Sequence, residues 1–178
     1  MLKIILIVAA IFVVVFVVIV SMQPANFKVS RSATISAPSE VVFAQVNDLH
    51  KFQEWSPWAK LDPNAKMTYE GPSTGVGARC AWEGNSKVGA GSMTVAESRP
   101  NELIRFDMAF LKPFKANNAV EFVFKGRGNQ TDVTWNMTGT NNFFFKAFSL
   151  FMDCDKMVGP DFERGLANLN QVCQLAAK

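Results

Sequence analysis

The sequence predicts an α+β domain in which a curved antiparallel sheet of about seven strands packs around a long C-terminal helix. Three observations lead to this fold class. Residues 27–140 contain repeated segments with apolar side chains at every second position, residues 143–177 repeat apolar side chains at spacings of three and four, and an uncharged apolar run precedes both. A sheet and a helix that are each apolar on one side bury those sides by packing together. We expect the order apolar helix, strand, two short helices, six strands and long helix.

The apolar run from Ile4 to Met22 predicts one transmembrane helix. About 20 apolar residues, at a rise of 1.5 Å each, cross a hydrocarbon core of about 30 Å. A cleaved secretory signal is the alternative, but its apolar core is usually about 7–15 residues and ends at a pair of small residues. Ser21-Met22-Gln23 makes a poor cleavage site. We therefore expect a retained anchor and short linker over residues 1–25, with the membrane as a partner through residues 4–22.

Charges beside the apolar run do not fix its orientation. Lys3 and the α-amino group on one side are balanced by Lys28 and Arg31 on the other. A very short basic N-terminus is typical of a signal anchor whose C-terminal domain is exported, which favours the periplasmic side. An odd number of unclustered cysteines opposes export, because such thiols are typical of a reduced core.

A single domain follows the anchor, because residues 26–178 are enough for one core and too few for two. The chain has 18 Lys and Arg residues against 15 Asp and Glu, and leaving out Lys3 lowers the net charge from +3 to +2. The basic residues are scattered and form no stripe that would follow phosphates. We expect no nucleic acid among the partners.

The first strand is expected at residues 27–35, where apolar and polar side chains alternate. Ser36 is a plausible cap for the helix that follows, and Pro38 suits an early helical position. A second short helix over residues 49–55 should end before Pro57, because proline disfavours a helical conformation in the residue before it.

Six further strands are expected between residues 67 and 140, with aromatic and methionine side chains on one face and polar side chains on the other. Turns at residues 99–102 and 126–129 fit hairpins, which favours antiparallel pairing. The chain ends in a helix over residues 143–177, with a break or kink expected at Gly159-Pro160 and one apolar stripe after it.

Short motifs along the whole domain carry a family resemblance. They are Ser32-Ala33-Thr34-Ile35-Ser36-Ala37-Pro38, Trp55-Ser56-Pro57-Trp58, Trp82-Glu83-Gly84-Asn85, Gly89-Ala90-Gly91-Ser92-Met93, Lys112-Pro113-Phe114-Lys115, Val133-Thr134-Trp135 and Asp155-Lys156-Met157-Val158-Gly159. With these motifs the chain resembles a helix-grip domain of the START/Bet v 1-like (SRPBCC) superfamily. More closely, it is similar to the polyketide cyclase/dehydrase-type family, in a bacterial branch with an N-terminal membrane helix. The resemblance implies a cavity between sheet and helix, in a superfamily that binds lipids, sterols, isoprenoids and polyketides.

The expected ligand-binding residues are the large apolar side chains that the sheet and the C-terminal helix turn towards each other. They are Trp55, Trp58, Tyr69, Trp82, Phe106, Met108, Phe122, Phe124, Trp135, Met137, Met152, Met157 and Phe162. Pockets for small apolar ligands have such walls. Packing of a filled core is the alternative for each residue. In the Trp55-Ser56-Pro57-Trp58 segment, a plug at the end of the sheet competes with ligand contact.

No catalytic residue, metal or cofactor is expected. His50 is the only histidine and is expected on the surface. Asp153 and Asp155, two positions apart on a helix, point to different sides and do not form a carboxylate pair. The cysteines lack the spacing of metal ligands; they are Cys80, Cys154 and Cys173.

The polar residues of the strands are expected on an outer, ion-paired face of the sheet. They are Glu83, Arg105, Asp107 and Glu121. General acid–base chemistry would then have Tyr69 or His50 as its only actors. The sequence favours a membrane-anchored binding domain for a small hydrophobic or amphipathic molecule, such as a lipid, isoprenoid or polyketide-like compound. A polyketide cyclase/dehydrase-like enzyme and a structural or interaction module with a filled core are the alternatives.

Overall fold

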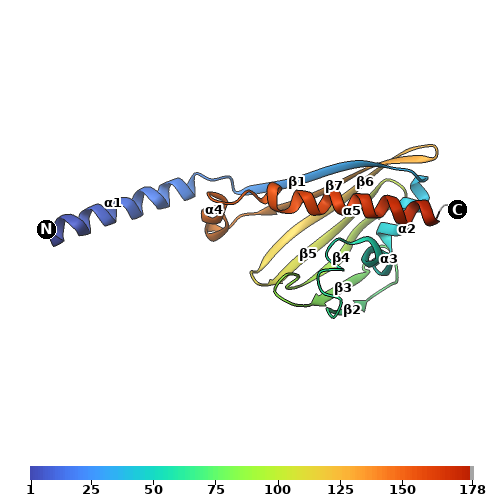
Figure 1. The fold of residues 1–178 in the computed structure, drawn as a ribbon, viewed down its shortest axis with the longest axis horizontal. Coiled ribbons are helices and arrows are strands. Elements are labelled where there is room, and N and C mark those ends of the chain that lie inside the picture. Colours follow the sequence, from blue (N-terminus) through green and yellow to red (C-terminus); the bar gives the residue numbers. More distant parts are fainter. Residues whose placement is uncertain (177–178) are drawn as a thin grey trace.

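The computed structural model describes residues 1–176 and has the expected order of elements. Helix α1 (Leu2–Ser21) projects from one end of the domain (Figure 1). The elements that follow are β1 (Asn26–Ile35), α2 (Ser39–Asn47), α3 (Leu49–Trp55), β2 (Lys66–Glu70), β3 (Arg79–Glu83), β4 (Ala90–Arg99), β5 (Leu103–Lys112), β6 (Ala116–Arg127), β7 (Gln130–Thr140), α4 (Phe143–Ser149) and α5 (Cys154–Ala176).

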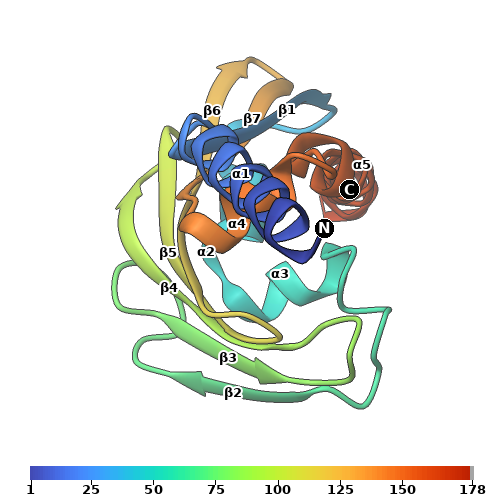
Figure 2. The same cartoon turned by 90° about the vertical axis from the view of Figure 1, so that its left-hand side faces the viewer.

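The strands form one antiparallel sheet of seven strands in the order β1-β7-β6-β5-β4-β3-β2. The sheet curves, and α5 runs along β1 on its concave side (Figures 1 and 2). Two register shifts between β4 and β5, at Ala90/Gly91 and Val95/Glu97, fit this curvature, because bulges bend and twist a strand. The α+β helix-grip fold predicted from the sequence is confirmed.

The core lies where α3 and α5 cover the middle of the sheet. Trp135 of β7 and Phe122 of β6 are cross-strand neighbours with ring centroids 4.7 Å apart. Phe52 of α3 packs edge-on against Phe122, and Phe162 of α5 stacks on Trp135 at 4.1 Å. These rings join two helices to the sheet, so they fix the depth at which each helix sits.

The outer face of the sheet carries the ion pairs that the strand alternation predicted. Arg105 donates to Glu97 at 2.8 Å and to Glu121 at 2.9 Å, and Lys112 donates to Glu83 at 2.7 Å. Arg105, Glu97 and Glu121 therefore point away from the concave side on which α5 lies, whereas Lys112 also lines the cavity on that side.

Two local expectations were wrong. The C-terminal helical region is interrupted at residues 150–153, between α4 and α5, and α5 runs through Pro160 without a break. Helix α2 begins at Ser39 with Pro38 as its N-cap, so Ser36 is not the cap. The backbone N–H of Ser36 instead donates to Asn170 of α5 at 2.8 Å.

Helix α1 is long and apolar enough to cross a membrane, with a mean hydropathy of 3.6, and a signal sequence would share these properties. Every residue of α1 is exposed except Val20 in its last turn. That turn lies against α4, where Lys146 Nζ donates to the carbonyl oxygen of Ser21 at 3.4 Å. The helix therefore leaves the domain at a defined place.

Candidate functional site

A cavity of about 470 Å³ lies on the concave side of the sheet, enclosed by α3, α5 and the loops after α3 and β3. Ligand pockets usually measure about 300–1,000 Å³. Its apolar wall is formed by Phe52, Trp58, Met67, Tyr69, Trp82, Met93, Met108, Phe110, Val120, Trp135, Met137, Val158 and Phe162. The size and composition are those of a site for a small apolar molecule.

Strand alternation explains how the wall is built. Met67 and Tyr69 of β2, like Met108 and Phe110 of β5, are two residues apart and therefore share one face. Gly91 of β4 lies opposite Trp82 of β3, and a Cβ at Gly91 would lie 2.5 Å from the indole ring. The glycine thus lets the Trp82 ring lie across the neighbouring strand and form part of the wall.

Polar groups gather at the rim of the cavity. Asp62 accepts a hydrogen bond from the backbone N–H of Asn85 at 2.7 Å, which joins the loop after α3 to the β3–β4 turn. Lys112 also belongs to the rim and pairs with Glu83, which lowers the pKa of that carboxyl group. Gln53 and Lys87 complete the polar rim. An amphipathic ligand would find apolar walls inside and charged groups at the opening.

Three of the four indoles at or near the cavity differ in the hydrogen bond that Nε1 makes. Nε1 of Trp55 donates to the carbonyl oxygen of Gln45 at 3.1 Å, and Nε1 of Trp82 donates to that of Val88 at 3.2 Å. Nε1 of Trp135 is buried and has no partner among residues 1–176. A buried donor left unsatisfied costs about 1–3 kcal/mol. Trp135 also lines the cavity, but Nε1 itself is covered, so a ligand oxygen would reach it only by displacing the atoms that cover it.

The structure separates the residues expected at the site into three groups. The cavity is lined by Trp58, Tyr69, Trp82, Met108, Trp135, Met137 and Phe162. Four others lie outside its lining and pack within the core: Trp55, Phe106, Phe122 and Phe124. The remaining two, Met152 and Met157, are exposed and lie outside the lining.

Packing explains these differences. The ring of Phe52 packs 6.0 Å from Phe106 and 6.3 Å from Phe122, and the ring of Trp55 packs 6.0 Å from Phe122, so aromatic rings of α3 cover both residues. On α5, Val158 and Phe162 are four residues apart and face the sheet, whereas Met157 is one position, or about 100°, away from Val158.

The two tryptophans of the Trp55-Ser56-Pro57-Trp58 segment lie in different surroundings. Trp55 is fully buried in the core. Trp58 lines the cavity and packs edge-on against Trp135 at 5.9 Å. The first tryptophan therefore packs within the core, and the second forms a wall of the cavity.

Several wall residues were not among those expected, including Phe52, Met67, Met93 and Phe110. Strand alternation could have found the last three, because each shares a face with a residue that was expected or with Val95 of the core. Phe52 gave no such signal, because a seven-residue helix does not reveal which of its faces is buried.

Two ionisable side chains face the cavity from β2 and β3. Burial raises the pKa of Tyr69, and burial raises the pKa of Cys80 to about 11, so both groups are neutral at pH 7. Tyr69 stacks on His50 with ring centroids 3.8 Å apart, and His50 is exposed as expected. Across residues 1–176, no group of three or more His, Cys, Asp and Glu side chains could hold a metal ion.

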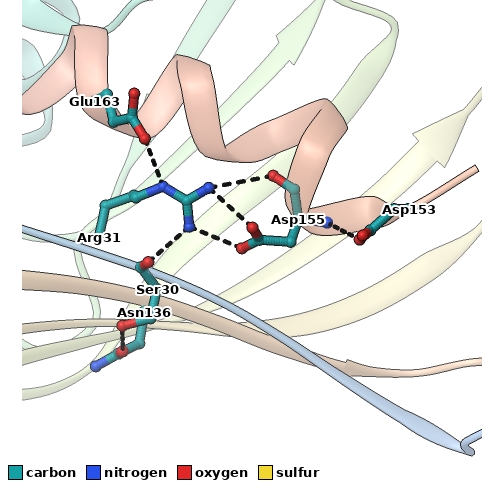
Figure 3. A network of polar contacts seen from close by, with 6 residues as sticks. All are labelled: Ser30, Arg31, Asn136, Asp153, Asp155 and Glu163. Carbon is teal, nitrogen blue, oxygen red and sulfur yellow. Dashed lines mark hydrogen bonds and ion pairs between the residues drawn. The ribbon is translucent and has the colours of Figure 1, made fainter.

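A charged cluster holds α5 against β1 (Figure 3). Arg31 of β1 donates to both carboxylate oxygens of Asp155, at 2.7 and 2.9 Å, and to Glu163 at 2.7 Å. These hydrogen bonds raise the pKa of Arg31, and the bond from Arg31 lowers the pKa of Asp155. Gly159 lies between the two acidic residues, and a Cβ there would overlap the guanidinium group.

This cluster positions the α5 side of the cavity. Asp155 and Glu163 flank Val158 and Phe162 in sequence, and both latter residues line the cavity. Sequence reasoning missed the cluster, although Arg31 occupies an inward position of the first strand, between Val29 and Ala33. A charged residue at such a position indicates a partner on the element that packs there.

Comparison with solved structures supports the fold. Mll3558 from Rhizobium loti has 14% identity and a TM-score of 0.62, covering 82% of this chain and 96% of that one. An Aha1 dimer from Colwellia psychrerythraea has 15% identity and a TM-score of 0.59, covering 83% and 96%. The ZhuI aromatase/cyclase from Streptomyces sp. R1128 has 12% identity and a TM-score of 0.59, covering 86% and 96%. At these identities the likeness shows the fold alone.

Sequence comparison is more specific. No protein among the curated ones matches the chain. Residues 26–174 match the model of the family described as polyketide cyclase / dehydrase and lipid transport. The match begins at the first residue of β1 and ends within α5, so it covers the sheet, the cavity and the charged cluster. The chain therefore belongs to the polyketide cyclase/dehydrase and lipid transport family.

Proposed function

We propose that this protein binds a small, mostly apolar molecule with at least one oxygen acceptor and holds it beside the membrane in which α1 is anchored. The observation that carries the proposal is the cavity of about 470 Å³ between the sheet and α5, with its aromatic and thioether walls. A filled core would leave no such space, so the cavity favours a binding domain over a purely structural module.

The volume limits the size of the ligand. One water occupies about 30 Å³ in the liquid, so the cavity has room for on the order of 15 groups of that size. A fused aromatic compound, a short isoprenoid or part of an acyl chain fits this volume. A complete two-chain phospholipid does not, so such a lipid would place only part of one chain inside.

The polar groups indicate where oxygen atoms of the ligand would lie. The Tyr69 side chain lines the cavity, and the unpartnered Nε1 of Trp135 is a buried donor behind the apolar wall. Lys87 and Lys112 lie at the rim and suit a negatively charged end. This distribution favours an amphipathic ligand, for example a ketone, quinone or carboxylate, over a plain hydrocarbon.

The length and hydropathy of α1 support membrane anchoring. The exposed surface of the helix supports it as well, because 17 of its residues would otherwise present apolar side chains to water. A retained helix keeps the cavity near the source of an apolar ligand, which dissolves poorly in water. Orientation with the domain on the periplasmic side remains our expectation from the short N-terminus.

Native mass spectrometry of the full-length protein, gently extracted from its own membranes, tests both parts of the proposal. We expect an intact mass that includes α1 and a bound organic molecule that extraction identifies. Ala59→Trp would fill the rim, and Ala81→Trp would add the same side chain on the outer face of β3. The bound molecule should be lost only from Ala59→Trp. Equal occupancy in both variants, or an empty wild-type protein, would contradict binding in the cavity.

Tyr69 favours a second function, a cyclase- or dehydrase-like reaction. Its pKa is raised by burial, so its hydroxyl group remains protonated and could donate a proton or hydrogen bond to a substrate oxygen. Incubation of the extracted molecule with the protein, followed by mass spectrometry, tests this function. Conversion that Tyr69→Phe abolishes while binding persists would establish it, whereas an unchanged molecule would leave binding as the function.

A further inference from the structure

The end of the domain from which α1 projects carries an apolar surface that we name the collar. It consists of Leu111, Phe114, Phe143, Phe144, Phe148 and Phe151. Phe151 is 81% exposed, and the other five are between 42% and 54% exposed. Phe114, in the β5–β6 turn, and Phe144, in α4, have ring centroids 5.2 Å apart, so the two segments form one continuous surface.

Helix α4 is unusual for a helix in water. It has seven residues, four of them phenylalanine, and none of its side chains is buried. Isolated helices of fewer than about 12 residues are marginal in water, and their stability normally comes from an apolar face packed against the protein. Within residues 1–176 this face is only partly covered, by Phe114 and the last turn of α1. An apolar environment outside the domain would supply the missing burial.

The position of α1 identifies that environment. Only residues 22–25 separate α1 from β1, and this linker is tied to the domain: the N–H of Asn141 donates to the carbonyl oxygen of Ala25 at 2.7 Å. Val20 is buried, and Lys146 of α4 contacts Ser21. The view from the α1 end shows α4 beside the base of α1 (Figure 2). A membrane that contains α1 therefore meets the collar.

We propose that the collar inserts into the interfacial layer of the bilayer around the base of α1, so that the cavity exchanges its ligand directly with the lipid phase. This inference rests on the proposed anchoring and deepens it. Aromatic side chains are enriched at this depth, and Lys115 and Lys146, in the two segments of the collar, suit phosphate headgroups.

The β5–β6 turn connects the collar with the cavity. Phe110, Lys112 and Pro113 line the cavity, whereas Leu111 and Phe114 of the same segment belong to the collar. An apolar ligand that enters beside this turn would pass from lipid to the cavity wall without crossing bulk water. The same geometry places the charged rim at the level of the headgroups.

The test measures the depth of single fluorescent labels in the full-length protein, reconstituted into phosphatidylcholine vesicles with and without phosphatidylglycerol. An environment-sensitive fluorophore is attached at Phe12→Cys in α1, at Phe151→Cys in the collar or at Asn129→Cys in the β6–β7 turn. That turn lies at the end of the sheet away from α1, because β1 pairs with β7 from Asn26↔Thr140 to Ile35↔Thr131. Cys154 is replaced by Ser. The other two native thiols are buried with raised pKa values, so they react slowly.

Brominated lipids then quench only labels that touch the bilayer. We expect loss of most of the fluorescence at positions 12 and 151, and little loss at 129. If the label at position 12 is quenched but the label at 151 stays as bright as that at 129, the insertion of the collar is refuted and the membrane anchor stands. Cross-linking through the thiols of unlabelled Phe151→Cys copies, together with no quenching of the label at 151, would assign the collar to a dimer and would also overturn it. Absence of quenching at all three positions would contradict the anchor itself.

Discussion

Replacement of Trp135 by phenylalanine should separate ligand recognition from folding. The substitution removes the unpartnered Nε1–H and keeps an aromatic ring that can stack on Phe162, now 4.1 Å away. Two effects on the free energy of unfolding oppose each other. Loss of a buried unsatisfied donor stabilises the unliganded protein by about 1–3 kcal/mol. Loss of about 50 Å² of apolar surface destabilises it by roughly 1 kcal/mol. We expect Trp135→Phe to remain within about 2 kcal/mol of the wild type.

Ligand affinity should change far more, and only for ligands with an oxygen acceptor. A ligand oxygen that displaces the atoms now covering Nε1 and accepts its hydrogen bond would recover the cost of about 1–3 kcal/mol, which corresponds to about 5- to 150-fold in the dissociation constant. Calorimetric titration with 2-acetylnaphthalene and with 2-isopropenylnaphthalene compares a ketone and an alkene of the same shape. Trp135→Phe should weaken binding of the ketone and leave that of the alkene nearly unchanged. Because each ligand is compared between wild type and Trp135→Phe, the ratio of the two changes in dissociation constant does not depend on how the two ligands differ in hydration.

Trp55→Phe and Trp82→Phe are the matched controls. Each removes an indole N–H that already donates to a backbone carbonyl, so each should destabilise the fold by about 1–2 kcal/mol without changing the preference for the ketone. If Trp135→Phe weakens both ligands equally, or neither, Nε1 does not face the ligand and the reasoning is refuted. A preference lost equally in Trp82→Phe would also refute it.

Three further outcomes are expected around α5. Asp155→Asn should lower the free energy of unfolding at pH 7: the pKa of Asp155 lies below its ordinary value of 3.8, so its contribution is complete above that pH and is lost as pH falls through the lowered pKa. Urea titrations at pH 7 and pH 3 should show a difference from wild type that shrinks at pH 3, and a constant difference would contradict the pairing with Arg31. Phe162→Ala should cost about 3–5 kcal/mol and lower the melting temperature by roughly 10 °C, and a loss under about 1 kcal/mol would mean that its stacking on Trp135 is loose. Gly159→Ala should displace Arg31, so its loss of stability and that of Arg31→Met should not add in a double-mutant cycle; additive losses would contradict the contact.

The sequence predicted the fold well because the fold depends on periodicity. Period-two alternation and the helical stripe repeat over many residues, so the sheet, the long helix and their contact follow from the average pattern. Pro160 shows where this reasoning ends. A proline in a helical pattern predicts a break, yet here the packing of α5 on β1 on both sides of Gly159 maintains one continuous helix. The helical region is interrupted instead at residues 150–153. Nothing in the sequence around these residues indicates a tertiary contact as strong as those that Arg31 makes with α5.

The site was less predictable, because lining and core residues have the same composition and alternation. Phe122 and Trp135 are cross-strand neighbours on one face, but only Trp135 reaches the cavity. The rings of Phe52 and Trp55, both from α3, cover Phe122, whereas Trp135 contacts both rings and still keeps part of its surface on the cavity. Which residue a short helix places over a sheet depends on its depth and rotation, and these follow from tertiary packing. The sequence pattern therefore predicts which face of the sheet the cavity lies on, but not which residues of that face line it.

The arrangement of fixed and weakly held elements indicates how the cavity opens. α5 is held by the ion pairs of Arg31 and by Phe162 stacked on Trp135, so lifting it would expose charged and aromatic groups together. The loops after α3 and β3 are joined by hydrogen bonds from Asn85 to Asp62 and to the carbonyl oxygen of Leu61, with no stacked aromatic pair between them among the described residues. Local opening is favoured where few buried apolar contacts must break. Ligand exchange should therefore occur by movement of the loops after α3 and β3 while α5 stays in place, and the collar would set the height of that opening above the bilayer.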